Sequence, residues 1–206
     1  MPHPPLVLAS GSPSRRTLLE RLGIPFTAVT PDVDETRRPG ESPQKLVVRL
    51  AEAKARAVVE NYPNALIIGS DQVAYLDGAV IGKPGSRARA IAQLTRASAR
   101  EVVFYVGLCL LNAATGRTQI CCEPFRVHFR QLSPARIEAY VDRERPFDCA
   151  GSFRSERLGI ALFERLEGDD PNALMGLPLI RLIAMLEQEG IDPLGRSVHE
   201  TGRIAH

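Results

Sequence analysis

The chain has 206 residues, of which 44% are hydrophobic and 24% are charged. These values are ordinary for a globular domain and exclude a disordered chain, a collagen and a coiled coil. A net charge of +2 gives no general case for nucleic-acid binding, and scattered arginines with few aromatic residues between them do not favour RNA. We expect one domain over 1–194 and a polar tail over 195–206.

The segments that would direct the chain to a membrane or out of the cell are not found in the sequence. No apolar run reaches the ~20 residues of a membrane-spanning helix. The first residues, MPHPPLVLAS, lack the basic start and apolar core of a signal peptide. We therefore expect a cytoplasmic protein with no membrane partner. The four cysteines show no C-x-x-C spacing, so reduced thiols packed in strands are expected.

The first half of the chain alternates between predicted strands and helices. Predicted strands cover 6–9, 26–29 and 65–69. Predicted helices cover 13–22, 42–61 and 86–95. The polar stretch 31–43 contains three prolines and is predicted to be a loop. Residues 73–81 are predicted to form a short hairpin that turns at Asp77-Gly78.

The second half begins with two long β-rich runs, 101–112 and 118–130, joined at Thr115-Gly116. This pattern predicts an antiparallel hairpin. It is followed by a predicted helix over 133–142, a strand over 160–163 and a last helix over 177–188. Alternating elements followed by a long hairpin indicate an α/β fold with a mixed sheet, not a fully parallel one.

The segment SGSPSRR at 10–16 connects a predicted strand to a predicted helix. Backbone N–H groups at a helix N-terminus favour anions, and serine hydroxyls and a guanidinium add hydrogen bonds to phosphate. We therefore take Ser10, Ser12 and Arg15 as candidate phosphate ligands. A helix cap beside two solvated arginines explains the segment equally well. The segment fits neither the P-loop nor the Rossmann pattern.

Two groups of carboxylates are candidates for metal or proton chemistry. Asp71 follows an apolar strand, and ligand sites in α/β folds gather at strand ends. A carboxylate there can bind a metal ion or orient a water. Glu35 belongs to an acidic cluster at 32–35 that can hold Mg²⁺ near phosphates. A turn cap at Asp71 and an ordinary acidic loop at 32–35 are the alternatives.

Lysine is scarce in this chain, which has 23 arginines and only 3 lysines. Lys54 adjoins the apolar face of a predicted helix, and Lys83 sits in a stiff Gly-Lys-Pro-Gly turn. A snorkelling side chain is the alternative for Lys54. Further along, the small residues of 149–155 precede Glu156, whose carboxylate could accept from the N1–H and 2-amino groups of a guanine.

Seven short motifs in this order, SGSPSRR, VDE, EAKA, GSDQ, GKP, AGSF and GLPL, resemble those of the Maf family of nucleoside triphosphate pyrophosphatases. The resemblance covers about residues 6–194. It implies an elongated mixed sheet flanked by helices, with two lobes around a cleft. It also implies a cytoplasmic enzyme, often a homodimer, that cleaves the α–β phosphate bond of a nucleotide with a divalent metal ion, Mg²⁺ or Mn²⁺.

The resemblance also assigns roles to individual residues. Asp71 matches the family's proton acceptor, and Lys54 and Lys83 match basic groups around the phosphates. Ser12 and Arg15 match phosphate ligands, with Ser10 in the same motif. Glu35 matches an acidic site residue, so that Glu35 and Asp71 together are the expected metal ligands. Positions that tune base choice correspond to Ser14, Gln72 and Glu156.

Gln72 and Glu156 resemble the family branch that acts on 7-methyl-GTP. Ser14 departs from that branch, which often has a bulky aromatic residue at this position. A methylated guanine is cationic and would be attracted to an aromatic face, for which Phe153 is a candidate. The alternatives are a dTTP/UTP pyrophosphatase of the same family, and a nucleotide-binding regulator of cell division with little turnover.

Overall fold

The computed structural model describes residues 3–195, in which seven strands form one mixed sheet flanked by five helices. The strands are β1 (Leu6–Ala9), β2 (Phe26–Val29), β3 (Leu66–Leu76), β4 (Ala79–Ile81), β5 (Glu101–Asn112), β6 (Thr118–Phe129) and β7 (Phe163–Glu167). The helices are α1 (Pro13–Glu20), α2 (Pro43–Arg56), α3 (Arg87–Ala97), α4 (Pro134–Glu144) and α5 (Leu179–Gln188). The predicted α/β fold with a mixed sheet is confirmed.

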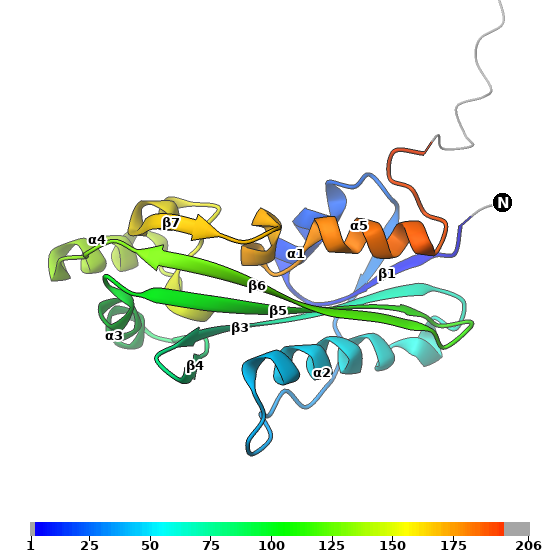
Figure 1. Ribbon diagram of the computed structural model, residues 1–206, viewed down its shortest axis with the longest axis horizontal. Helices are drawn as coiled ribbons and strands as arrows, with labels where there is room; N and C mark the ends of the chain where they lie inside the picture. The colour runs from blue at the N-terminus through cyan, green and yellow to red at the C-terminus, as the bar shows by residue number, and fades with distance from the viewer. Residues whose placement is uncertain (1–2, 196–206) are drawn as a thin grey trace, which may run out of the picture.

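The strand order is β2-β1-β3-β5-β6-β7, with β4 paired to β3. β1 runs parallel to β2 and β3, whereas β3, β5, β6 and β7 are antiparallel neighbours. Figure 1 shows the elongated sheet nearly edge-on, with α1 and α5 on one side of it and α2 on the other. Helices α3 and α4 lie near its far end. The predicted β5–β6 hairpin is confirmed.

The central strand β3 is longer than the sequence pattern predicts. Its pairing with β1 ends at Ala9 and Gly69, and it then continues without a break into the predicted hairpin with β4. Asp71 therefore lies inside a strand, opposite Gly107 of β5, and not at a strand end. It nevertheless sits just past the end of β1, where the sheet leaves room for a ligand.

Helix α2 packs against the sheet at two glycines. A Cβ at Gly69 would lie 2.0 Å from the carbonyl oxygen of Ala51, and one at Gly107 would lie 2.1 Å from that of Val47. Only residues without a side chain allow the helix backbone to approach two neighbouring strands this closely. Lys54, three residues after Ala51, is thereby brought down onto β3.

Two predicted boundaries are wrong. Helix α2 ends at Arg56 and not at residue 61, and a short 3₁₀ turn covers Val59–Asn61. The β-branched residues Val58 and Val59 lower helix propensity after Arg56, and Pro63 disfavours helical backbone at Tyr62, so a regular helix is not favoured in this segment. The predicted strand at 160–163 is instead a 3₁₀ turn over Leu158–Leu162, and β7 begins only at Phe163.

Charged side chains join the ends of β5, β6 and β7. The Nε2 atom of His128 lies 3.5 Å from Glu101 and 3.3 Å from Glu167, close enough for the three residues to share a metal ion. However, Arg126 already contacts Glu101 at 2.6 Å, and Arg165 contacts Glu167 at 2.6 Å. We therefore interpret this cluster as cross-strand ion pairing.

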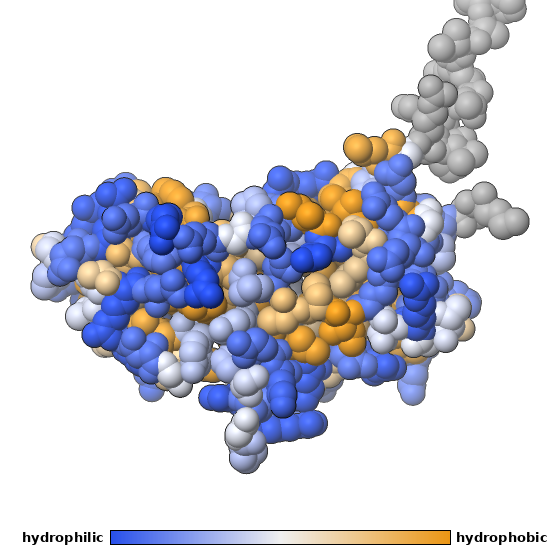
Figure 2. Space-filling model, viewed as in Figure 1, coloured by the Kyte–Doolittle hydropathy of each residue, from blue (hydrophilic) through white to orange (hydrophobic). Residues whose placement is uncertain are grey.

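Within residues 3–195, no helix has the length and apolar character needed to span a membrane. On the face shown in Figure 2, hydrophilic side chains cover most of the surface, and apolar side chains gather in a band between α5 and α2. Apart from Gly195, the predicted tail 195–206 lies outside the described residues.

Candidate active site

A cavity of about 600 Å³ opens beside the end of β1. Its walls come from the start of α1, from α2, from β3, from the turn before α3 and from the segment after α4. All ten site residues predicted from the sequence line it: Ser10, Ser12, Ser14, Arg15, Glu35, Lys54, Asp71, Gln72, Lys83 and Glu156. The fold thus gathers residues that lie up to 146 positions apart in the sequence around one space, although their chemical roles remain proposals.

The N-terminus of α1 forms the first wall. Ser12 caps the helix and accepts a hydrogen bond from the backbone N–H of Arg15 at 3.4 Å. The hydroxyl of Ser10 accepts from Arg15 Nη1 at 3.3 Å, and Arg15 Nε donates to the carbonyl of Gly176 at 2.8 Å. These bonds fix the guanidinium in place. Burial lowers the pKa of Arg15, while the nearby carboxylates of Asp71 and Glu35 act in the opposite direction.

Lys54 joins the two carboxylates predicted to carry the chemistry. Its Nζ lies 2.7 Å from Asp71 Oδ1 and 2.6 Å from Glu35 Oε1. Lys54 and Asp71 are each only 7% exposed, so the snorkelling alternative for Lys54 is wrong. The hydrogen bond from Lys54 lowers the pKa of Glu35, and the positive charges of Lys54, Lys83 and Arg15 lower it further. Three cations therefore surround this carboxylate.

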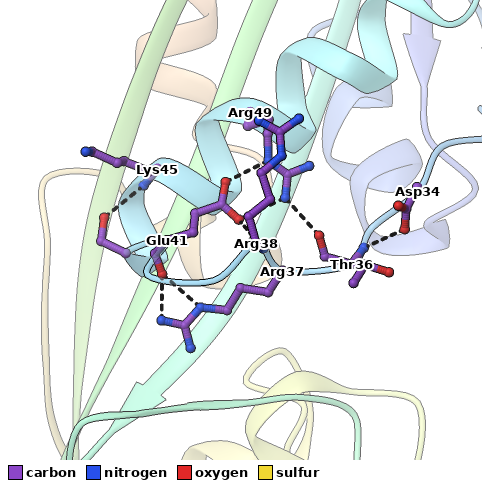
Figure 3. Close-up of polar contacts among 8 residues, drawn as sticks. Asp34, Thr36, Arg37, Arg38, Glu41, Lys45 and Arg49 are labelled. Atoms are coloured by element: carbon purple, nitrogen blue, oxygen red, sulfur yellow. Dashed lines mark hydrogen bonds and ion pairs between the residues drawn. The ribbon is translucent and has the colours of Figure 1, made fainter.

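The site loop, residues 31–42, presents Glu35 to the cavity and is held by its own polar contacts (Figure 3). Glu41 accepts two hydrogen bonds from Arg49 of α2, at 2.7 and 2.9 Å. Arg49 also donates to the carbonyl of Thr36 at 3.0 Å, and the Thr36 N–H donates to Asp34 at 2.9 Å. These contacts fix the loop on both sides of Glu35.

The hydrogen bonds from Arg49 lower the pKa of Glu41 from 4.5 to about 2. Because the pKa is lower in the folded state, this carboxylate stabilises the fold above pH ~4.5 and loses its contribution as the pH falls toward ~2. We expect Glu41→Gln to lower stability at pH 7, with the difference from wild type shrinking between pH 4.5 and 2. Chemical denaturation across this range measures the effect. A difference that does not depend on pH would contradict this assignment.

The wall that adjoins α1 was not predicted from the sequence. It is a 3₁₀ turn over Pro171–Met175, and the carbonyl of Gly176 at its end accepts from Ser70 Oγ at 2.8 Å as well as from Arg15. The side-chain amide of Gln72 donates to the carbonyls of Ala173 and Leu174. The side-chain N–H groups of Gln72 therefore hold this wall in place.

The buried carboxylate of Asp170 fixes the start of the same turn. Asp170 is 1% exposed and accepts from the backbone N–H groups of Asn172 at 2.8 Å and Ile180 at 2.6 Å. It thus joins the turn to the beginning of α5. The motif GLPL pointed to this region, but nothing in its spacing pointed to Asp170, because one of two adjacent aspartates in a polar stretch resembles any solvated turn residue.

The base-side segment, residues 147–156, forms the remaining wall. Glu156 is exposed and Ser14 is half-buried, and both line the cavity. Phe153 also lines it, but its ring is only 5% exposed and packs edge-to-face against Phe104, Phe129 and Phe163. Phe153 was a candidate for the aromatic contact with the base, but its ring belongs to the core and does not offer an open face.

All four cysteines have free thiols. Cys109 is fully buried in β5, as expected for a small strand residue. Cys149 lines the cavity, where burial raises its pKa to about 11. A thiol with this pKa stays protonated at neutral pH and is a poor nucleophile. Cys149 is therefore not a candidate nucleophile at neutral pH.

Comparison with known proteins agrees with this geometry. The family model described as Maf-like protein matches residues 5–189. A protein of Vibrio vulnificus named 7-methyl-GTP pyrophosphatase is 58% identical over 190 residues, which cover 92% of this chain and 97% of its own. A protein of Pseudomonas aeruginosa with the same name is 55% identical over 189 residues, covering 92% and 98% of the two chains. The chain belongs to the Maf family.

Proposed function

We propose that this protein hydrolyses 7-methyl-GTP to 7-methyl-GMP and pyrophosphate. The observation that carries the proposal is the cavity in which Lys54 joins Glu35 and Asp71 beside the fixed guanidinium of Arg15. Relatives that are 55–58% identical and are named for this activity support the choice of substrate. Residues 1–194 are proposed to act as one catalytic domain.

The cations of the cavity are proposed to bind the triphosphate. Arg15, Lys54 and Lys83 approach it from three different elements, and the hydroxyls of Ser10 and Ser12 lie at the start of α1. Cations spread along the phosphates neutralise the charge that shifts toward the leaving pyrophosphate. Because Arg15 is held by Ser10 and Gly176, it needs no reorganisation when the nucleotide binds.

Asp71 is proposed to act as the general base. Lys54 contacts its Oδ1, and the second oxygen remains for a water. The carboxylate accepts a proton as the water oxygen bonds to the α-phosphorus. The bond from the α-phosphorus to the bridging oxygen then breaks, and that oxygen leaves with pyrophosphate. A positioned base of this kind contributes about 10²–10⁴-fold to the rate.

Glu35 and Asp71 would hold the divalent metal ion expected for this family. Both carboxylates contact one ammonium group, so they already converge on a cation. Mg²⁺ binds well to one or two carboxylates combined with substrate phosphates. When bound, the ion would neutralise phosphate charge. We expect activity with Mg²⁺ or Mn²⁺ and its loss with EDTA.

Base choice is proposed to depend on Ser14, Gln72 and Glu156. Glu156 lines the cavity and is proposed to accept from the donor edge of guanine, and Gln72 is proposed to act through the wall it holds. Because residue 14 is a serine, helix α1 offers no aromatic ring to the cationic base.

We expect Ser14→Trp to lower the KM for 7-methyl-GTP by about 2–30-fold, because a cation–π contact contributes about 0.5–2 kcal/mol. The KM for GTP, whose base is neutral, should change less. Ser14→Leu is the matched control, since it adds apolar volume without an aromatic face. If Trp and Leu give the same KM ratio between the two nucleotides, the base does not lie against position 14.

The substrate is tested by measuring pyrophosphate release from 7-methyl-GTP, GTP, dTTP, UTP, CTP and ITP. We expect the highest kcat/KM for 7-methyl-GTP, at least tenfold above that for GTP. A preference for dTTP or UTP would favour the other branch of the family. No release from any nucleotide would favour a regulatory protein that binds nucleotide with little turnover.

The remaining expectations from the family resemblance are also proposals. They are a homodimer, a cytoplasmic location and no stable nucleic-acid partner. Light scattering after size-exclusion chromatography tests the first of these: a mass near 45 kDa supports the dimer, since one chain has a mass of 22.5 kDa.

A further inference from the structure

The turn that carries Lys83 is attached at one end to the wall where the base is proposed to bind and at the other end to helix α3. The backbone N–H of Gly85 donates to the carbonyl of Phe147 at 2.9 Å. The carbonyl of Gly82 accepts from the side-chain amide of Gln93 at 3.2 Å. Lys83 itself is exposed and lines the cavity, so the position of its amine depends on how this turn is held.

Gln93 lies on α3 and is not among the residues that line the cavity. Its Nε2 donates to Gly82, and its Oε1 accepts from the hydroxyl of Ser152. One side-chain amide therefore joins the Lys83 turn, residues 82–85, to the middle of the base-side segment. Neither contact involves the substrate directly.

Ser152 is held in an uncommon conformation. It is fully buried, and its φ of +63° follows a φ of +74° at Gly151. A left-handed backbone is strained for a residue with a side chain and persists only where surrounding contacts hold it. The bond to Gln93 is such a contact. A shift of the base-side segment would therefore be passed through Gln93 to the Lys83 turn.

We propose that Gln93 is a positioning residue that makes the placement of Lys83 depend on how the base is seated. This inference rests on the proposed pyrophosphatase function. When the base fits its wall, the base-side segment and the Lys83 turn are fixed together, and Lys83 meets the phosphates in the productive geometry. The identity of the base then affects kcat as well as KM. Without this coupling, base contacts would contribute equally to the ground state and the transition state and would change KM alone.

Three variants separate the two hydrogen bonds of the Gln93 side chain, one with Gly82 and one with Ser152. Gln93→Met removes both hydrogen bonds at nearly constant size. Gln93→Glu keeps the acceptor for Ser152 but removes the donor to Gly82. Ser152→Ala removes only the hydrogen bond between Ser152 and Gln93. Arg89→Ala, an exposed substitution on the same helix, is the control. For each variant, kcat and KM are measured for 7-methyl-GTP and GTP, together with Tm.

We expect the wild type to have a higher kcat for 7-methyl-GTP than for GTP. Gln93→Met breaks both hydrogen bonds, but these act in series as one link. It should therefore reduce this kcat ratio about fivefold, the effect expected for one hydrogen bond, and leave the KM ratio unchanged. Gln93→Glu and Ser152→Ala should each give most of this effect. Adding Ser152→Ala to Gln93→Met should change the ratio little further, because both substitutions break the same link between the Lys83 turn and the base-side segment.

A wild type with equal kcat for both nucleotides would overturn the coupling, as would variants that lower Tm but keep the kcat ratio. Those results leave the proposed function intact, since both nucleotides are still hydrolysed. Absence of pyrophosphate release in the wild type is a different result, and it would overturn the proposed function and this inference together.

Discussion

Replacing Asp71 by Asn is expected to lower kcat by about 10²–10⁴-fold, because the variant loses the group proposed to accept the proton of the attacking water. The amide keeps an oxygen for the 2.7 Å contact with Lys54 Nζ. Lys54 also keeps its pairing with Glu35. The fold should therefore be retained, with a loss of about 1–3 kcal/mol in the free energy of unfolding.

The measurement pairs steady-state kinetics with calorimetric titration of a non-hydrolysable analogue whose α–β bridge is a methylene group. We expect binding within about tenfold of wild type. Asp32→Asn is the control, because Asp32 is an exposed carboxylate of the site loop that does not line the cavity. An Asp71→Asn variant whose kcat stays within tenfold of wild type would remove the general base from the mechanism. If the wild type itself shows negligible turnover, this result would also favour a regulatory protein that binds nucleotide without hydrolysing it.

Replacing Gly69 by Ala is expected to displace α2 and, with it, Lys54. The added Cβ would lie 2.0 Å from the carbonyl oxygen of Ala51, an atom of the helix backbone that cannot rotate away. The helix must move outward by more than ~1 Å, and a displacement of that size in a catalytic group can cost about 100-fold in rate. Overpacking of this kind also costs about 1–3 kcal/mol of stability.

The kinetic effect is separated from the loss of stability by assaying at a temperature where circular dichroism shows the variant fully folded. Gly107→Ala should give the same result from the neighbouring strand, because its Cβ would lie 2.1 Å from the carbonyl of Val47. If Gly69→Ala keeps wild-type stability and kcat, α2 does not depend on this close approach.

Much of the fold was predictable because local patterns and tertiary packing agree. The Ser-Pro starts of α1, α2 and α4 are true N-caps, and the β5–β6 hairpin follows from two long apolar runs. Two errors came from tertiary effects. Asp71 looked like the end of a strand, but pairing with β5 continues β3 through it. The segment at 160–163 was read as a strand from its composition, yet it forms a tight turn before β7.

The ten predicted site residues all line one cavity. Most of them stood in motifs with a chemical reason, whereas Ser14 and Gln72 were predicted only from the family resemblance. The scarcity of lysine identified Lys54 and Lys83 in a chain that otherwise uses arginine. Residues that hold the site indirectly carried no such signal. Ser70, Asp170 and Gln93 act through backbone carbonyls and N–H groups that only the folded chain brings near. Phe153 was misjudged for the same reason, since its three aromatic neighbours are distant in sequence.

In the proposed mechanism, water attacks the α-phosphorus of 7-methyl-GTP in this cavity. Hydrolysis in water labelled with ¹⁸O, followed by mass spectrometry of both products, tests it most directly. We predict that one ¹⁸O atom enters 7-methyl-GMP and that pyrophosphate remains unlabelled. Label in pyrophosphate would place the attack on the β-phosphorus, and release of labelled orthophosphate would place it on the γ-phosphorus. Either result would contradict the mechanism.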